Sequence, residues 1–157
     1  MHIGVISDTH GLLRPQVFSV FQGVDHILHA GDVGPPDILT ELEALAPLTA
    51  VYGNTDDFDL RARIPEVARL ELAGVPTVLL HGHQLAPLTP EAAASAHPDG
   101  TLVIYGHTHR PRIENVGETL TLNPGSAGPR RFKLPVSVAL IEIREGRIRP
   151  RLVELDT

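Results

Sequence analysis

The chain has 157 residues, of which 42% are hydrophobic and 20% charged, and it contains no cysteine. Without thiols there are no disulfides, thiolate ligands or cysteine nucleophiles, so any metal ion must be bound through nitrogen and oxygen. The net charge of −6 argues against a nucleic-acid-binding protein, and no apolar run reaches the length of a membrane-spanning helix.

The length predicts one domain that covers residues 1–157. The first ten residues, MHIGVISDTH, lack the basic region of a secretory signal and have the pattern of a strand from the start. We therefore expect a cytoplasmic protein. The sequence leaves open whether the chain forms a homo-oligomer.

Short apolar runs recur along the first two-thirds of the chain, and helical patterns separate them. Each run is partly β-branched and ends in a turn that contains glycine or aspartate, which is typical of a buried strand. The alternation of strands and helices favours an α/β fold. The predicted strands are 3–7, 26–30, 48–52, 77–80 and 102–105, and the predicted helices are 14–21, 36–46 and 90–96.

Three other segments have the pattern of antiparallel strand pairs. Residues 68–80 form two strands joined across Gly74, and residues 111–123 form a hairpin that turns at Val116-Gly117. Residues 136–155 alternate well and turn at Glu145-Gly146. These pairs favour two mixed sheets flanked by helices over a single parallel sheet.

Polar residues follow each of the five predicted parallel strands, usually after a glycine. In α/β proteins, ligands collect beyond the carboxyl ends of the strands, so these residues converge if the strands run in one direction. Glycine at such a position permits a sharp turn and a close approach to an ion. The residues are Asp8, His10, Asp32, Asn54, His81, His107 and His109.

Each of these motifs also has a simpler interpretation. Asp32 could end a turn or cap the helix predicted at Pro36, and Asn54 could occupy a left-handed turn. His107 and His109 could lie in a solvated loop. Five strand ends that all finish in metal-ligand residues are poorly explained by five unrelated turns, so the set favours a metal site. For His29, a hydrogen bond to a ligand residue and a purely structural role are equally good interpretations.

The order of these motifs resembles the calcineurin-like metallophosphoesterase superfamily. The sequence GNTD at 53–56, and NPGS at 123–126 followed by Arg130, are similar to its compact bacterial and archaeal phosphodiesterases. The resemblance extends from residue 3 to about residue 143. It implies a four-layer α/β/β/α sandwich.

The resemblance also implies two divalent transition-metal ions. One would be held by Asp8, His10, Asp32 and His109, and the other by Asp32, Asn54, His81 and His107, so that Asp32 bridges the pair. Nitrogen and oxygen ligands together suit transition metals, and we expect manganese, with iron, nickel, cobalt and zinc as alternatives. The expected activity is hydrolysis of a small phosphate ester by a hydroxide activated between two metals. The ester is either a phosphodiester or a monoester, and a nucleotide derivative is one candidate.

Thr55 departs from the superfamily pattern, in which a histidine at this position is thought to act as a general acid. Proton donation to the leaving group would then fall to water, to Asp56 or to Asp57, which favours substrates with good leaving groups. Asn54 and Asp56 are candidate catalytic residues, and Asn54, Thr55 and Arg130 are candidate substrate contacts. The small retromer subunit resembles the same branch, so a metal-binding interaction scaffold is the alternative function.

Overall fold

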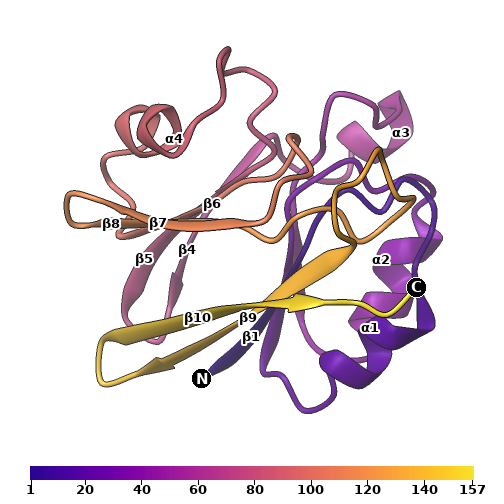
Figure 1. Cartoon of the computed structure of the whole chain (residues 1–157), viewed down its shortest axis with the longest axis horizontal. Coiled ribbons are helices and arrows are strands. Elements are labelled where there is room, and N and C mark those ends of the chain that lie inside the picture. Colours follow the sequence, from indigo (N-terminus) through magenta and orange to yellow (C-terminus); the bar gives the residue numbers. More distant parts are fainter.

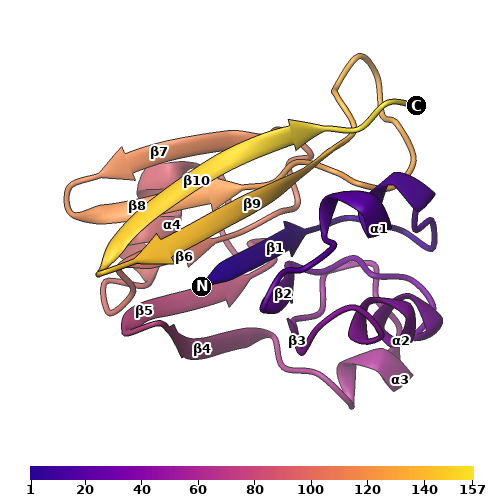
Figure 2. The same ribbon diagram turned by 90° about the horizontal axis from the view of Figure 1, so that it is seen from below.

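The computed structural model describes all residues from 1 to 157, which form two five-stranded sheets packed face to face (Figures 1 and 2). In spatial order, the first sheet consists of β10 (Arg147–Glu154), β9 (Ser137–Arg144), β1 (His2–Ile6), β2 (His26–His29) and β3 (Leu48–Ala50). The second consists of β4 (Val67–Leu72), β5 (Val75–Leu80), β6 (Leu102–Ile104), β8 (Thr119–Asn123) and β7 (Arg112–Val116).

Four short helices cover the outer faces of the two sheets. Helices α1 (Pro15–Val20), α2 (Asp37–Glu43) and α3 (Phe58–Arg61) lie against the first sheet, and α4 (Pro90–Ala96) lies against the second (Figure 1). The fold is thus the expected α/β/β/α sandwich of two mixed sheets. None of the helices has the length and apolar character needed to cross a membrane.

Three layers of buried apolar side chains hold the four structural layers together. Burial of such side chains is the main favourable contribution to folding, at roughly 25 cal/mol per Å² of apolar surface. The cluster between the sheets includes Ile3, Leu28, Leu79, Ile104 and Ile141. The cluster behind the first sheet includes Phe21, Ile27, Leu42 and Leu60, and that beneath α4 includes Val78, Ala93 and Tyr105.

The segment 55–65, in which the sequence predicts no helix, contains the one-turn helix α3. Asp57 begins this helix, because its Oδ1 accepts a hydrogen bond of 3.0 Å from the backbone N–H of Leu60. A single turn is too short to show an apolar repeat, so the capping aspartate was the only available signal. Helix α2 is also shorter than predicted, since it ends at Glu43 instead of Ala46.

The five strands that carry the predicted ligands are divided between the two sheets. Strands β1, β2 and β3 are parallel neighbours in the first sheet, and β5 and β6 are parallel neighbours in the second. The loops after both groups meet at the same edge of the sandwich, where the backbone N–H of His107 donates to Asp8 Oδ2 at 3.2 Å. The packing of the sheets, and not one continuous sheet, brings the ligands together.

We predict that Gly4→Ala destabilises the contact between the first sheet and α1. A Cβ atom at Gly4 would lie 2.8 Å from ring atoms of Phe21, so the ring or the strand must move, at a cost of about 1–3 kcal/mol in the free energy of unfolding. Urea unfolding measures this cost. The same change in a Phe21→Leu background should cost less, and equal costs in both backgrounds would contradict this packing.

Candidate metal centre

The loops at one edge of the sandwich place all seven predicted ligand residues close together. Backbone hydrogen bonds join the first two loops, from the N–H of Asp8 to the carbonyl of Gly31 (3.0 Å) and from that of His10 to the carbonyl of Asp32 (2.9 Å). In the second sheet, the N–H of Gly106 donates to the carbonyl of His81 at 3.1 Å. The loops are therefore fixed to one another by main-chain contacts.

Close packing of these loops requires glycine at two of the predicted positions. A Cβ atom at Gly53 would overlap the carboxylate and backbone nitrogen of Asp32. A Cβ atom at Gly106 would overlap the hydroxyl of Ser7 and approach the carboxylate of Asp8. In both loops the absence of a side chain lets a carboxylate lie against the neighbouring backbone.

Backbone strain is concentrated at this site. Eight non-glycine residues of the chain have a positive φ, and five of them are predicted ligands. A left-handed conformation costs of order 1–3 kcal/mol, although Asp and His tolerate it better than most residues. Such strain persists only where the surrounding contacts enforce it. The five residues are Asp8 (56°), His10 (46°), Asp32 (54°), His107 (68°) and His109 (62°).

Asp8, His10 and His109 form the first group, in which one ligand atom from each lies within 4.8 Å of the others. Asp8 Oδ1 is 3.2 Å from His109 Nε2 and 3.7 Å from His10 Nε2. The buried atoms Asp8 Oδ1, His10 Nε2 and His109 Nδ1 have no hydrogen-bond partner that meets normal geometry. Buried polar atoms are rarely left unpaired, and Asp8 Oδ1 and His10 Nε2 lie only 3.7 Å apart, so the pair indicates a place for a cation.

Asp32, His81 and His107 form the second group, again within 4.8 Å of one another. His81 Nε2 is the central atom. It lies 3.1 Å from Asp32 Oδ2, 3.0 Å from Asn54 Oδ1 and 3.2 Å from His107 Nδ1. Asp32 does not cap α2, because Pro36 occupies the cap position of that helix.

The tautomer of His81 makes this second group strongly attractive to a cation. Its Nδ1 is 2.8 Å from the carbonyl of Ala30, an acceptor, so Nδ1 carries the proton. In the neutral ring, Nε2 then directs a lone pair at the oxygens of Asp32 and Asn54. Lone pairs that face one another repel unless a proton or a metal ion lies between them. Burial lowers the pKa of His81, but the carboxylates of Asp32 and Asp8 outweigh it, and the net shift is upward.

The two groups adjoin, and Asp32 lies between them. Its Oδ2 is 3.1 Å from His81 Nε2 and 3.7 Å from His10 Nε2, and so approaches a nitrogen of each group. Asp8 Oδ1 also lies 3.9 Å from His81 Nε2. This arrangement is what a ligand shared by two ions requires.

Both carboxylates are ionised at neutral pH despite their burial. Burial raises the pKa of Asp32, but the hydrogen bond from His81, its charge and the N–H of Thr55 lower it to about 2 overall. For Asp8, burial likewise raises the pKa, but the neighbouring His10 and His109 lower it well below its usual range. The site therefore holds two negative charges that need compensation.

Asp56 lies beside the centre but uses its carboxylate to hold two loops together. Its Oδ1 accepts from the N–H groups of Val33 (2.9 Å) and Gly34 (3.1 Å), and its Oδ2 accepts from that of Gly53 (2.8 Å). The Asp32 loop and the Asn54 loop are both tied to this one buried side chain.

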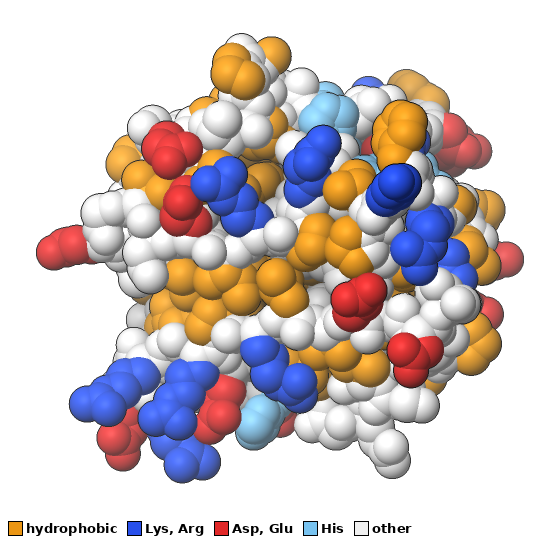
Figure 3. Space-filling model, viewed as in Figure 1, with side chains coloured by type: hydrophobic (Ala, Val, Ile, Leu, Met, Phe, Trp, Pro, Cys, Tyr) orange, Lys and Arg blue, Asp and Glu red, His pale blue; other side chains and the backbone are white.

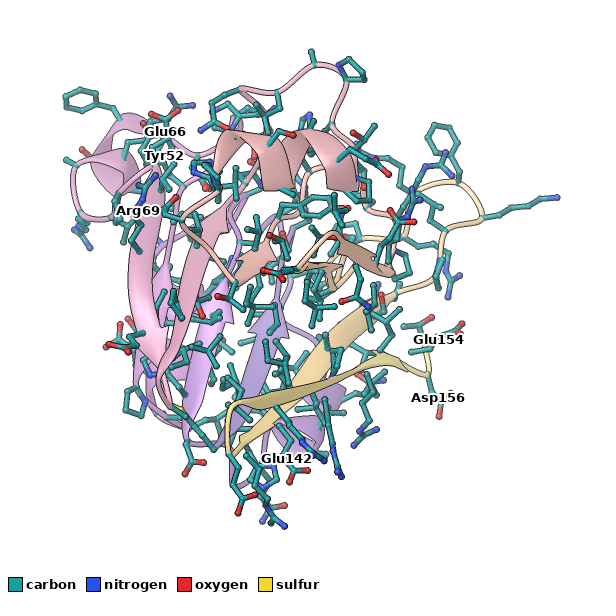
Figure 4. The ribbon with its side chains drawn as sticks, turned by 90° about the vertical axis from the view of Figure 1, so that its left-hand side faces the viewer. Tyr52, Glu66, Arg69, Glu142, Glu154 and Asp156 are labelled. Carbon is teal, nitrogen blue, oxygen red and sulfur yellow. The ribbon has the colours of Figure 1, made fainter.

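Arg61 of α3, which the sequence did not single out, holds the same turn from the other side. Its guanidinium donates to the carbonyls of Asp56 (2.8 Å), Asn54 (3.0 Å) and Gly53 (3.4 Å). It also lies 4.9 Å from the ring centre of Tyr52. The hydroxyl of Tyr52 donates to Glu66 at 3.3 Å, and Figure 4 shows these two side chains close together. No sequence motif marks this arginine, because its role depends on the conformation of α3.

The two predicted substrate contacts outside the ligand set lie in different surroundings. Thr55 is exposed at the centre, where its N–H donates to Asp32 Oδ1 at 2.9 Å. Arg130 donates from its guanidinium to the carbonyl of Leu134 (3.4 Å) and the hydroxyl of Thr157 (2.7 Å), and it forms no hydrogen bond to the seven ligand residues.

His29 is completely buried beneath the first two loops. Its Nδ1 accepts from the N–H of Gly31 at 3.1 Å, so its Nε2 carries the proton and donates to Thr9 Oγ1 at 3.0 Å. Thr9 in turn donates to the carbonyl of Val33 at 2.7 Å. His29 therefore hydrogen-bonds the backbone and Thr9 of the ligand loops instead of a ligand side chain, and burial lowers its pKa to about 4.

We predict that His29 makes the metal-free protein less stable in acid. The unfolded chain takes up a proton at His29 below about pH 6.5, whereas the folded chain does so only near pH 4, so stability is full above the first value and falls between them. Between pH 7 and pH 4.5, wild type should lose roughly 2 kcal/mol more than His29→Gln in urea unfolding. Equal losses would show that His29 is not held neutral.

Comparisons with known proteins show which family the chain resembles. Residues 1–146 match the model of the calcineurin-like phosphoesterase superfamily domain. A probable metallophosphoesterase of Methanothermobacter thermautotrophicus is 39% identical over 91% of this chain and 86% of its own. A phosphodiesterase of Methanocaldococcus jannaschii is 30% identical over 80% of this chain and 83% of its own.

The fold is also similar to that of solved structures. The Zn²⁺ complex of Vps29 from Entamoeba histolytica has a TM-score of 0.79 and 28% identity, with coverage of 98% of this chain and 99% of that one. The matched family model covers every strand except β10, and every loop that carries a ligand residue. The chain belongs to the calcineurin-like phosphoesterase superfamily.

Proposed function

We propose that this protein is a metal-dependent phosphodiesterase that binds two divalent ions and acts on a small phosphate ester. The observation that carries the proposal is the pair of adjoining ligand groups, with Asp32 between them and two unpaired ligand atoms, Asp8 Oδ1 and His10 Nε2, facing each other in the first group. The residue set fits such ions, because it combines carboxylate, amide and imidazole ligands without a thiolate. The whole chain would act as one catalytic domain.

In this proposal the first ion is held by Asp8, His10, Asp32 and His109, and the second by Asp32, Asn54, His81 and His107. Two such ions lower the pKa of a water molecule and neutralise the charge that grows on the phosphoryl oxygens. Manganese is our first expectation, and zinc is the main competitor because a related fold has been solved with it.

The chain itself supplies a fixed geometry for these ligands. The N–H groups of Thr55 and His107 hold Asp32 and Asp8 by their second oxygens, so that the opposite oxygen of each carboxylate faces the histidines. Asp56 and Arg61 would act as positioning residues, since together they bind the amides and carbonyls of the turn that presents Asn54. The loops of such a pre-organised site are already ordered before a ligand binds, so binding does not have to order them.

Hydrogen bonds of Asp56 and Asp57 reduce the number of residues that could donate a proton to the leaving group. Asp56 is committed to three backbone amides, and Asp57 accepts the N–H of Leu60 at the start of α3. Thr55 has no proton that it can release near neutral pH. We therefore propose that water protonates the leaving group and that esters of acidic alcohols, such as phenols, are the better substrates.

A metal-binding interaction scaffold is the second candidate. The likeness of the fold to Vps29, a vacuolar protein sorting protein, favours it. The ligand set argues the other way. A protein that only binds partners has no physical need for five strained ligand residues and two buried carboxylates at one edge. The two functions differ in whether the metal-loaded protein turns over a phosphodiester.

We predict that protein stripped by a chelator and reloaded with Mn²⁺ binds about two ions per chain, measured by calorimetry and elemental analysis. His107→Ala and His109→Ala should each weaken binding of one ion and lower hydrolysis of bis(p-nitrophenyl) phosphate at least about tenfold. His97→Ala is the matched control, because His97 contacts Arg69 on the exposed surface. No bound ion after loading with Mn²⁺ or Zn²⁺, or full activity of His107→Ala, would refute the proposal.

We predict that Thr55→His supplies the missing general acid. Rates should rise mainly for diesters with poorly acidic leaving groups, where general acid catalysis contributes up to about 10²–10⁴-fold, and should change little for p-nitrophenyl esters. The measurement is kcat against leaving-group pKa for wild type and variant. Equal gains across the series would exclude this explanation of Thr55.

A further inference from the structure

A groove of about 590 Å³ lies at the surface of the loop between β8 and β9. It is lined by Arg110, Phe132, Lys133 and Leu134. Arg110 directly follows His109 in the chain, so one wall of the groove begins at a predicted metal ligand. The groove therefore adjoins the loop that presents His107 and His109.

The loop that carries the rest of the groove is fastened to the first ligand loop. The hydroxyl of Ser126 donates to the carbonyl of Asp8 at 3.0 Å, and the N–H of Ala127 donates to that of Ser7 at 3.0 Å. Gly128 packs so closely on the backbone of Asp8 and Thr9 that a Cβ atom would overlap it. The loop that leads to the groove is thus anchored to the Asp8 loop through residues 126–128.

Phe132 presents its ring to solvent at this position. Its side chain is 88% exposed, and its φ of +55° is unusual for an aromatic residue. An exposed ring gains nothing from folding, and a left-handed backbone adds a cost, so the residue is poorly explained by stability. An exposed aromatic ring is suited to stacking against a flat ligand.

The two cations of the groove are free to bind an anion. Neither Arg110 nor Lys133 forms an ion pair or a side-chain hydrogen bond, although the chain carries a net charge of −6. On the face shown in Figure 3, Lys and Arg side chains gather near histidines and exposed apolar side chains at the upper edge. Positive charge beside an aromatic ring matches an aromatic group attached to a phosphate.

We propose that this groove binds the aromatic ester group of the substrate, so that the substrate class is an aryl or nucleoside phosphodiester. The ring of that group stacks on Phe132, and Arg110 and Lys133 attract the phosphate charge. The inference rests on the proposed function, since it assigns the substrate of the same centre. Catalysis itself does not require Phe132, which sets specificity by binding.

The sequence offers a direct optical test, because the chain contains no tryptophan. In Phe132→Trp, the single tryptophan reports on the groove, and Phe58→Trp is the matched control, since Phe58 is 84% exposed on α3 and does not line the groove. AMP should quench the fluorescence of Phe132→Trp in the Mn²⁺-loaded protein. Ribose 5-phosphate, which has the same phosphate but no base, should not, and Phe58→Trp should respond to neither.

Steady-state kinetics give the second test. Phe132→Ala should raise KM for bis(p-nitrophenyl) phosphate about fivefold with kcat within about twofold, the lower end of what loss of one stacking contact costs. Phe58→Ala should leave both constants unchanged.

The outcomes separate this inference from the proposed function. If wild type hydrolyses no phosphodiester, the proposed function fails, and the fluorescence titration still decides what the groove binds. If wild type is active but Phe132→Ala keeps its KM and AMP does not quench Phe132→Trp, the groove inference alone is overturned. Emission from Phe132→Trp that depends on protein concentration instead of AMP would assign the groove to contact between copies and would also overturn it.

Discussion

The burial of Asp8 and Asp32 as charged groups is the constraint on which this structure depends. Asp8 is inaccessible to solvent and Asp32 nearly so, yet the pKa of each is below its usual range. An ionised carboxylate in a protein interior is tolerated only when cations or several hydrogen bonds compensate it. Backbone N–H groups of neighbouring loops satisfy one oxygen of each, and imidazoles surround the other. The loops must therefore keep their conformations for the charges to stay buried.

Hydrogen bonds from residues outside the ligand set stabilise those strained loop conformations. Asp56 and Arg61 bind six backbone groups around the Asn54 turn and the Asp32 loop. His29 and Thr9 link the first two loops on the side that faces the protein interior. Strained backbone of this kind is found where function requires it, and here it coincides with the residues that the family resemblance implies as ligands.

The sequence predicted the sheet-and-helix pattern and the seven clustered residues, because both leave local signals. Apolar runs mark strands, and a ligand residue after a strand and glycine marks a strand end that faces a site. The sequence did not reveal α3, the contacts of Arg61 or the groove at Phe132. These depend on how short loops fold against one another, which no periodicity encodes. Asp56 is a further example of a role that the sequence did not reveal. Its motif suggested proton transfer, whereas its contacts in the structure are with backbone amides.

The division of the ligand residues between the two sheets has a mechanical consequence. Asp8, His10, Asp32 and Asn54 come from the first sheet, and His81, His107 and His109 come from the second. An ion held by residues from both sheets would cross-link the sheets at the edge that carries the ligand loops. It would resist sliding of one sheet over the other. Metal affinity would then be coupled to the packing of the two sheets. Apolar substitutions deep between the sheets would change the affinity for the ion.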